Sequence, residues 1–184
     1  MNKPRFVVLL AILALVVVSA ASARHVVVIR GTNGDDALTG TPSPDLILAK
    51  AGDDSINGLG GNDRIYAGWG DDVADGGLGN DLMIGGPGND VLTGSDGNDR
   101  IRGRAGDDNE DGGLGNDHMF GGRGVDVLQG GDGNDVLHAV AHDNQVDMLD
   151  CGPGQDVIWV NANEHDTYVN CEVVRTVSTT KADD

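Results

Sequence analysis

The chain has 184 residues, of which 30 are acidic and 12 basic, and its formal net charge is −18. A nucleic-acid-binding protein needs a basic surface, so this balance argues against nucleic acid as a partner and favours cations, metal ions first. Thirty glycines and an aromatic content of 3% argue against a conventional globular core.

The first segment, residues 1–23, has a basic start, an apolar run from Phe6 to Val18 and an Ala-x-Ala ending at Ala21–Ala23. This order is typical of a secretory signal peptide that is cut before Arg24. The alternative is an uncleaved membrane anchor, although the apolar run is short for a spanning helix. The segment therefore predicts a secreted, extracellular protein with no stable membrane insertion after cleavage.

The next segment, residues 24–30, contains the β-branched run from Val26 to Ile29. Each repeat of a repeat protein buries its apolar face only against its neighbours, so the first repeat needs a cover. We therefore expect residues 24–30 to form an N-terminal capping strand.

From residue 31 to residue 138 the chain repeats a nine-residue unit twelve times without a gap. Position six is Asp in all twelve units, position four is Gly in eleven, and position eight is Leu, Ile or Met in ten. Each unit, such as Gly76–Ile84, begins with turn-forming Gly, Asn and Asp and ends in three residues that we expect to form a strand. Two units close a coil of eighteen residues, so alternate units should lie on two parallel sheets, with the position-eight side chains between them.

These units resemble the G-G-x-G-x-D-x-U-x nonapeptides of the RTX (repeats-in-toxin) family. The resemblance covers residues 31–138 and implies an all-β, right-handed parallel β-roll, a form of β-solenoid. It also implies that each calcium ion lies between two stacked turns, held by Asp side chains and turn carbonyl groups. Members of the family carry the repeats beside protease, lipase, haemolysin or epimerase domains, and nothing in this sequence supplies such a domain.

The position-six carboxylates should form two columns, in which neighbours about 5 Å apart repel by on the order of 1 to 3 kcal/mol. A cation would relieve this repulsion, and we expect at most about ten calcium ions between the stacked turns. The alternative is that these residues only cap turns through backbone N–H groups. Two prolines alter the turn before Asp45, which is left out of the ligand set. The predicted metal ligands are Asp36, Asp54, Asp63, Asp72, Asp81, Asp90, Asp99, Asp108, Asp117, Asp126 and Asp135.

Two further features of the repeats leave alternatives open. Glu110 occupies position eight of the ninth unit, where an apolar side chain should face the core, so either the strand bends or Glu110 turns outward. The outward positions seven and nine are apolar and basic in the even-numbered units but small and polar in the odd-numbered ones. The even-numbered face is a candidate surface for self-association or for an anionic cell-envelope polymer, and the alternative is drift on a tolerant surface.

After His138 the register slips by three residues, and residues 139–175 form degenerate repeats and a C-terminal cap. We expect Asp156 to stack over Asp135, and Asp147, which lacks the turn glycines, to add no site. Cys151 and Cys171 are the only cysteines of an exported chain and are expected to form a disulfide. Free thiols or an intermolecular bridge are the alternatives. Residues 176–184 are expected to be a disordered tail.

No catalytic motif stands out. The five histidines do not follow a zinc-binding pattern, and there is no G-x-S-x-G motif. The sequence therefore predicts a non-enzymatic, secreted calcium-binding repeat protein that folds on binding several calcium ions. The alternative function is an extracellular structural or adhesive rod that uses the even-numbered face.

Overall fold

The computed structural model describes residues 26–139, 143, 145–162 and 165–177. The predicted signal peptide, residues 1–23, lies outside these ranges, and so do residues 178–184 of the predicted tail. Within the described ranges every regular element is a strand, and no helix is long and apolar enough to cross a membrane.

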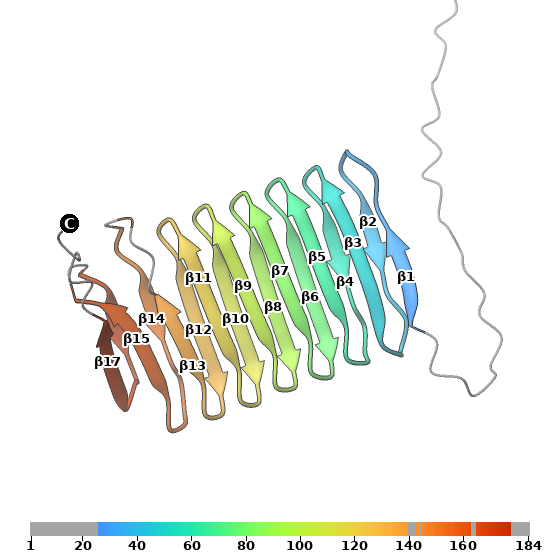
Figure 1. Ribbon diagram of the computed structural model, residues 1–184. Helices are drawn as coiled ribbons and strands as arrows, with labels where there is room; N and C mark the ends of the chain where they lie inside the picture. The colour runs from blue at the N-terminus through green and yellow to red at the C-terminus, as the bar shows by residue number, and fades with distance from the viewer. Residues whose placement is uncertain (1–25, 140–142, 144, 163–164, 178–184) are drawn as a thin grey trace, which may run out of the picture.

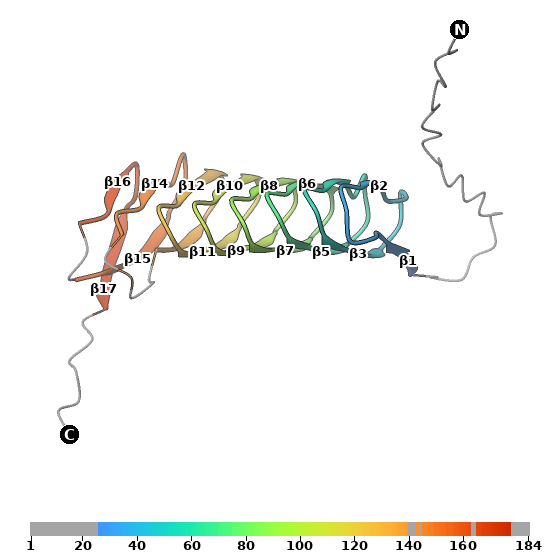
Figure 2. The same cartoon turned by 90° about the horizontal axis from the view of Figure 1, so that it is seen from above.

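Seventeen strands wind between two parallel sheets that face each other along the length of the molecule (Figures 1 and 2). The nine-stranded sheet contains, in order, β1 (Val27–Arg30), β3 (Asp45–Ala51), β5 (Arg64–Trp69), β7 (Leu82–Pro87), β9 (Arg100–Ala105), β11 (His118–Arg123), β13 (Val136–Ala139), β15 (Val157–Asn161) and β17 (Val173–Val177). The eight-stranded sheet contains β2 (Ala37–Thr39), β4 (Ser55–Asn57), β6 (Val73–Leu78), β8 (Val91–Asp96), β10 (Asn109–Leu114), β12 (Val127–Asp132), β14 (Met148–Asp150) and β16 (Thr167–Val169).

Alternate units lie on the two sheets, as the nine-residue repeat predicts. Ile65 of β5 pairs with Met83 of β7, which pairs with Ile101 of β9, and each step is eighteen residues. Two units therefore make one coil, and the predicted all-β parallel solenoid is confirmed.

The strands of the central coils are longer than the three residues we expected. β7, for example, runs for six residues, from position seven of one unit to position three of the next. Glycine-rich segments have low intrinsic strand propensity. Their extended form here comes from pairing with the coils on either side, as between Gly86 and Arg104. The prediction of strand length was wrong because local sequence preference does not include this pairing.

The core is a single thin layer of position-eight side chains between the sheets, as expected. Ile65, Met83 and Ile101 from the nine-stranded sheet meet Leu92 and Leu128 from the eight-stranded sheet, and all five are 0% exposed. Burial of apolar area at roughly 25 cal/mol per Å² favours the coiled form. The layer is only one side chain thick, so the turns that join the sheets lie close to the core.

The C-terminal end follows the predicted change of register. Val136 of β13 pairs with Val157 of β15, a step of twenty-one residues instead of eighteen. Cys151 and Cys171 form the predicted disulfide, with their Cα atoms 5.2 Å apart. The start of the predicted tail, at residues 176–177, belongs to β17.

Candidate metal centre

The turns between strands depend on glycine at position four, which only Ser43 replaces among the twelve units. From Gly52 to Gly133 this residue has a positive φ in ten units, such as 131° at Gly79. A Cβ added at Gly79 would overlap the carbonyl oxygen of Gly61 in the preceding coil. Glycine therefore allows both the left-handed backbone and the close stacking of successive turns.

The position-six aspartates line the two edges of the roll where these turns stack. We call the turns of the even-numbered units the even edge and those of the odd-numbered units the odd edge. Except for Asp36, each of these aspartates is at most 3% exposed. The even edge holds Asp45, Asp63, Asp81, Asp99, Asp117 and Asp135, and the odd edge holds Asp36, Asp54, Asp72, Asp90, Asp108 and Asp126.

One carboxylate oxygen of each stacked aspartate joins neighbouring coils. Oδ1 of Asp99 accepts a hydrogen bond from the backbone N–H of Asp81 at 2.7 Å, and Oδ1 of Asp81 accepts one from Asp63 at 2.7 Å. The odd edge repeats the pattern, with 2.9 Å from the nitrogen of Asp90 to Oδ1 of Asp108. The aspartates thus do bind backbone N–H groups, but of the neighbouring coil, and this uses only one of their two oxygens.

The second oxygen, Oδ2, is buried without a hydrogen-bond partner in ten of the twelve position-six aspartates. The two exceptions are Asp36, whose Oδ2 accepts from the backbone N–H of Thr32, and Asp45, whose Oδ2 accepts from Thr41. Buried polar atoms are almost always paired, and one without a partner calls for an explanation such as an ion. Ten such atoms in two regular columns point to a repeated site.

Glycine at position one, present in all units except those that begin with Ala49 and Ala67, keeps side chains away from these free oxygens. A Cβ added at Gly112 would lie 2.5 Å from Oδ2 of Asp117 and 2.5 Å from the carbonyl oxygen of Gly130 in the next coil. At Gly130 the corresponding distances are 2.6 Å to Oδ2 of Asp135 and 2.5 Å to the carbonyl oxygen of Cys151. A carboxylate oxygen and a carbonyl oxygen from two coils therefore face the same space, which contains no side chain.

This donor set fits calcium. Calcium takes six to eight oxygen ligands in a flexible arrangement of carboxylates, carbonyl groups and water, whereas zinc and copper prefer histidine and cysteine. In the described part of the chain, no three His, Cys, Asp or Glu side chains converge on one point. An ion between two turns would therefore take its remaining ligands from backbone carbonyl groups and water.

Burial raises the pKa of the stacked carboxyl groups in the metal-free roll. The pKa is raised to about 7 at Asp63 and Asp99 and to about 8 at Asp108, chiefly because burial disfavours the charged form. Hydrogen bonds from the neighbouring backbone N–H groups lower these pKa values, and the carboxylates stacked above and below raise them again. The columns are thus costly to ionise without a cation.

A second ladder at position five distinguishes the two edges. On the even edge the side chain of Asn80 accepts from the backbone N–H and from the side-chain amide of Asn98, at 2.7 and 3.1 Å. On the odd edge Asp53 takes the same place and accepts from the backbone N–H of Asp71 at 2.9 Å. Sequence reasoning missed this ladder, although the alternation of Asn and Asp at position five was a visible signal. The even edge has Pro44, Asn62, Asn80, Asn98, Asn116 and Asn134 at position five, and the odd edge has Asp35, Asp53, Asp71, Asn89, Asp107 and Val125.

Glu110 follows neither alternative considered for it. Its side chain is 0% exposed and lies inside the roll, while β10 keeps its regular pairing. Oε1 accepts a hydrogen bond from the backbone N–H of Gly103 at 2.5 Å, and Oε2 is buried without a partner. Burial, with smaller contributions from Asp108 and Asp126, raises the pKa of Glu110 to about 8. The strand need not bend because the backbone N–H group of Gly103 meets the carboxyl group inside the roll.

The columns extend beyond the twelve units. Asp156 stacks over Asp135 as expected, accepting from its backbone N–H at 2.8 Å, and Asp147 stacks in the same way over Asp126 at 2.9 Å. The ladders end at two residues that sequence reasoning missed. Asp166 accepts from Asp147 at 3.1 Å and Glu172 accepts from Asp156 at 2.9 Å.

Comparison with known families agrees with this geometry. The family model of the RTX calcium-binding nonapeptide repeat (four copies) matches six overlapping windows, at residues 30–63, 39–74, 48–83, 75–110, 84–119 and 111–146. None of the curated proteins matches the chain. The windows together span residues 30–146, well over half of the chain, and include all twelve position-six aspartates. The chain therefore belongs to the family of RTX calcium-binding nonapeptide repeat proteins.

Proposed function

We propose that the chain is a secreted calcium-binding protein whose β-roll folds when several calcium ions bind between stacked turns. The observation that carries the proposal is the two columns of buried Oδ2 atoms without partners. The ligands would be the carboxylates predicted above: Asp36, Asp54, Asp63, Asp72, Asp81, Asp90, Asp99, Asp108, Asp117, Asp126 and Asp135. Asp45 and Asp36 are the weakest members of the columns because their Oδ2 atoms already accept hydrogen bonds.

Calcium would supply the positive charge that the two edges lack. Without it, stacked carboxylates repel and are buried at a cost, so the charged chain favours unfolded states. An ion that binds only the folded roll adds its binding free energy to the stability of the fold. Folding would then follow the calcium concentration, with at most about ten ions bound per chain.

Export fits this mechanism. A chain that stays unfolded at low calcium would pass through a secretion channel and fold in the calcium-rich extracellular space. The disulfide between Cys151 and Cys171 supports an oxidising location, where such bonds persist. The signal-like pattern of residues 1–23 supports the same route.

The primary test is far-UV circular dichroism of the full mature chain in EDTA and at increasing calcium. We expect β-sheet signal to appear cooperatively as calcium is added and to disappear again with EDTA. A spectrum that is the same in EDTA and in calcium would overturn the proposal.

The site assignment has a sharper test in the double variant Asp99→Asn and Asp117→Asn. Asparagine keeps an oxygen for the backbone ladder but removes the charge on either side of one gap between turns. We expect fewer bound calcium ions per chain, measured by equilibrium dialysis, and a higher calcium concentration at the folding midpoint. A control is Asp111→Asn, which removes one charge from the outer face of β10. An unchanged ion count in the double variant would refute the assignment.

A second role, as an extracellular structural or adhesive rod, is supported by the distribution of charge on the two sheets. This role would use the same calcium-dependent roll. Neither proposed role requires the protein to catalyse a reaction.

A further inference from the structure

Positive charge is confined to one of the two sheets. All eight Lys and Arg residues in the described part of the chain lie on strands of the nine-stranded sheet. The strands of the eight-stranded sheet carry none, but they do carry Asp75, Asp96, Asp111, Asp132 and Asp150. The eight cations are Arg30, Lys50, Arg64, Arg100, Arg102, Arg104, Arg123 and Arg175.

These cations are not neutralised within the molecule. Among the described residues no Lys or Arg forms an ion pair with a carboxylate, although acidic residues are far more numerous. The Lys50 ammonium group donates to the carbonyl oxygen of Gly31 at 2.5 Å, and Arg100, Arg102 and Arg175 lie over aromatic rings. The nine-stranded sheet thus presents unpaired positive charge, which favours an anionic partner.

The C-terminal half of this face is built as a stack across five strands. Phe120, His138 and Trp159 stack at centroid distances of 4.4 and 5.8 Å, with interplanar angles of 8° and 4°. The guanidinium of Arg102 lies 5.2 Å from the Phe120 ring, and that of Arg175 lies 5.2 Å from the Trp159 ring. The faces of these rings are therefore covered, and this half offers arginine side chains held in fixed positions.

The N-terminal half of the same face instead has open aromatic rings beside a groove. The groove, of about 200 Å³, is lined by three glycines and by Tyr66, Trp69, Ile84, Pro87 and Arg104. Trp69 is 70% exposed and Tyr66 37% exposed. Exposed rings beside a cation suit a ligand that has an apolar face and a negative charge at its rim.

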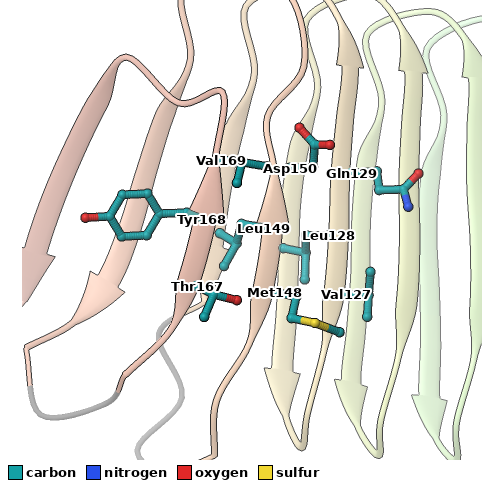
Figure 3. A pocket seen from close by; sticks show the side chains of 9 residues that line it. All are labelled: Val127, Leu128, Gln129, Met148, Leu149, Asp150, Thr167, Tyr168 and Val169. Carbon is teal, nitrogen blue, oxygen red and sulfur yellow. The ribbon is translucent and has the colours of Figure 1, made fainter.

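A groove of about 290 Å³ on the eight-stranded sheet has a different character (Figure 3). It is lined by side chains from β12, β14 and β16, such as Val127, Met148 and Thr167, and Asp150 is its only charged residue. Its one aromatic side chain, Tyr168, points away from the other labelled side chains (Figure 3). Cations and open rings therefore occur together only on the nine-stranded sheet, among the described residues.

We propose that the outer face of the nine-stranded sheet binds an acidic polysaccharide. One sugar ring would pack its C–H face on Trp69 and Tyr66, and its carboxylate would meet the Arg104 guanidinium, which can bind a carboxylate through two hydrogen bonds. The polymer would continue along the roll, where successive strands about 4.8 Å apart present Arg100, Arg102 and Arg123. The proposal goes beyond calcium binding, which it needs only to fold the roll.

The charge of the chain favours this partner over the two others that such a face could take. Nucleic acid carries much denser negative charge, which a chain of net charge −18 repels outside the cationic face. A second copy could place its acidic eight-stranded sheet on the cationic face, but two chains of net charge −18 repel each other. Both are outcomes of the test below.

The test measures binding of the full mature chain, in saturating calcium, to hyaluronate, a linear polymer with a carboxylate on every second sugar. We expect binding that weakens with added salt and no binding to neutral dextran. The triple variant Arg100→Gln, Arg102→Gln and Arg104→Gln should bind hyaluronate at least about tenfold more weakly, and Trp69→Ala about fivefold more weakly.

Matched controls lie on the opposite sheet. Asp96→Asn, Asp111→Asn and Asp132→Asn together also remove three charges, although of the opposite sign, and Leu114→Ala truncates an apolar side chain that is 53% exposed. Both should bind hyaluronate within about twofold of the unchanged chain. If the triple arginine variant binds like the unchanged chain, the proposal is wrong.

Two other results would also overturn it. Equal affinity for double-stranded DNA and hyaluronate would assign the face to polyanions in general. Association of the chain with itself in sedimentation, lost in the arginine variant while hyaluronate does not bind, would assign the face to a second copy. Circular dichroism in calcium reports the proposed folding separately, so failure of one proposal can be told from failure of the other.

Discussion

The two edges of the roll share one ladder and differ in another. Both stack position-six carboxylates through Oδ1 and leave Oδ2 free in the central coils. At position five, however, the even edge stacks asparagines that hydrogen-bond through both backbone and side-chain amides, as Asn98 and Asn116 do. The odd edge stacks aspartates, such as Asp53 and Asp71, which have no amide to donate.

The two edges therefore stabilise their stacked turns in different ways. A neutral asparagine ladder adds hydrogen bonds without charge, so the even edge has some cohesion of its own. The odd edge adds a second row of carboxylates beside the first. The buried side chain of Glu110 also lies close enough to Asp108 and Asp126 of this edge for their charges to raise its pKa. We therefore expect the odd edge to depend more strongly on calcium.

The largest effect should come from pH, because several carboxyl groups act together. Their pKa values in the calcium-free roll are raised above the usual 3.8, to about 7 at Asp99 and about 8 at Asp108. A raised pKa means that the protonated form favours folding, so stability is lost as the pH rises through these values. In EDTA the β-sheet signal should grow as the pH falls from about 8 to about 5.

Protons would stabilise the roll through the same oxygens that calcium uses, so the calcium concentration at the folding midpoint should fall as the pH falls over that interval. Circular dichroism titrations at both pH values check this. A calcium-free spectrum that does not change with pH would show that the buried carboxyl groups do not limit folding.

The next largest effect should come from filling the space beside Oδ2 of a position-six aspartate. In Gly112→Ala the new methyl group would meet Oδ2 of Asp117 and the carbonyl oxygen of Gly130. We expect a loss of about 3 kcal/mol in the free energy of unfolding in calcium, measured by thermal or urea unfolding. Gly34→Ala is the matched control, since nothing lies within 4 Å of its added Cβ. Equal effects of the two changes would contradict the crowding of position one.

Replacement of Glu110 by leucine should stabilise the roll by about 2 kcal/mol, since leucine is the common residue at position eight and the change removes a buried, partly unpaired carboxyl group. The pKa of Glu110 is raised to about 8, so the group is charged only above that value, and the gain should be larger at about pH 9 than at about pH 5. Thermal unfolding at the two pH values measures this gain in stability. Glu110→Gln, which removes the charge but keeps an oxygen for Gly103, separates the cost of charge from that of shape.

The smallest effect should come from exchange of the position-five residues. Asp53→Asn with Asp71→Asn should lower the calcium concentration needed for folding, and Asn98→Asp with Asn116→Asp should raise it. Each change should amount to about 1 kcal/mol or less, because these side chains are exposed and screened. Asp96→Asn with Asp132→Asn alters the net charge without changing a position-five residue and should shift the midpoint less. If the shift of the calcium midpoint depends only on the change in net charge for every pair of substitutions, the two edges do not differ in the way described.

Much of the architecture followed from the repeat. Strands bury alternate side chains, so a fixed nine-residue period with one apolar residue at position eight allows few arrangements other than two stacked sheets. The length of the strands did not follow, because segments such as Gly85–Pro87 become extended only through pairing with adjacent coils. The hydrogen-bond ladder at position five was also not predicted, since its hydrogen bonds depend on which turns lie side by side in the folded roll.

The sequence by itself determined the repeat, the sheet to which each unit belongs and the stacking of the position-six aspartates. These are consequences of period and composition, which require no knowledge of neighbours in space. Only the tertiary structure decided that one oxygen of each aspartate is used by the backbone while the other stays free, that Glu110 lies inside the roll, and that all the described cations share one face. The use of one aspartate oxygen arises from contacts between residues eighteen positions apart, where the backbone of one coil meets the side chains of the next. The burial of Glu110 instead involves Gly103, seven positions away on the opposite sheet.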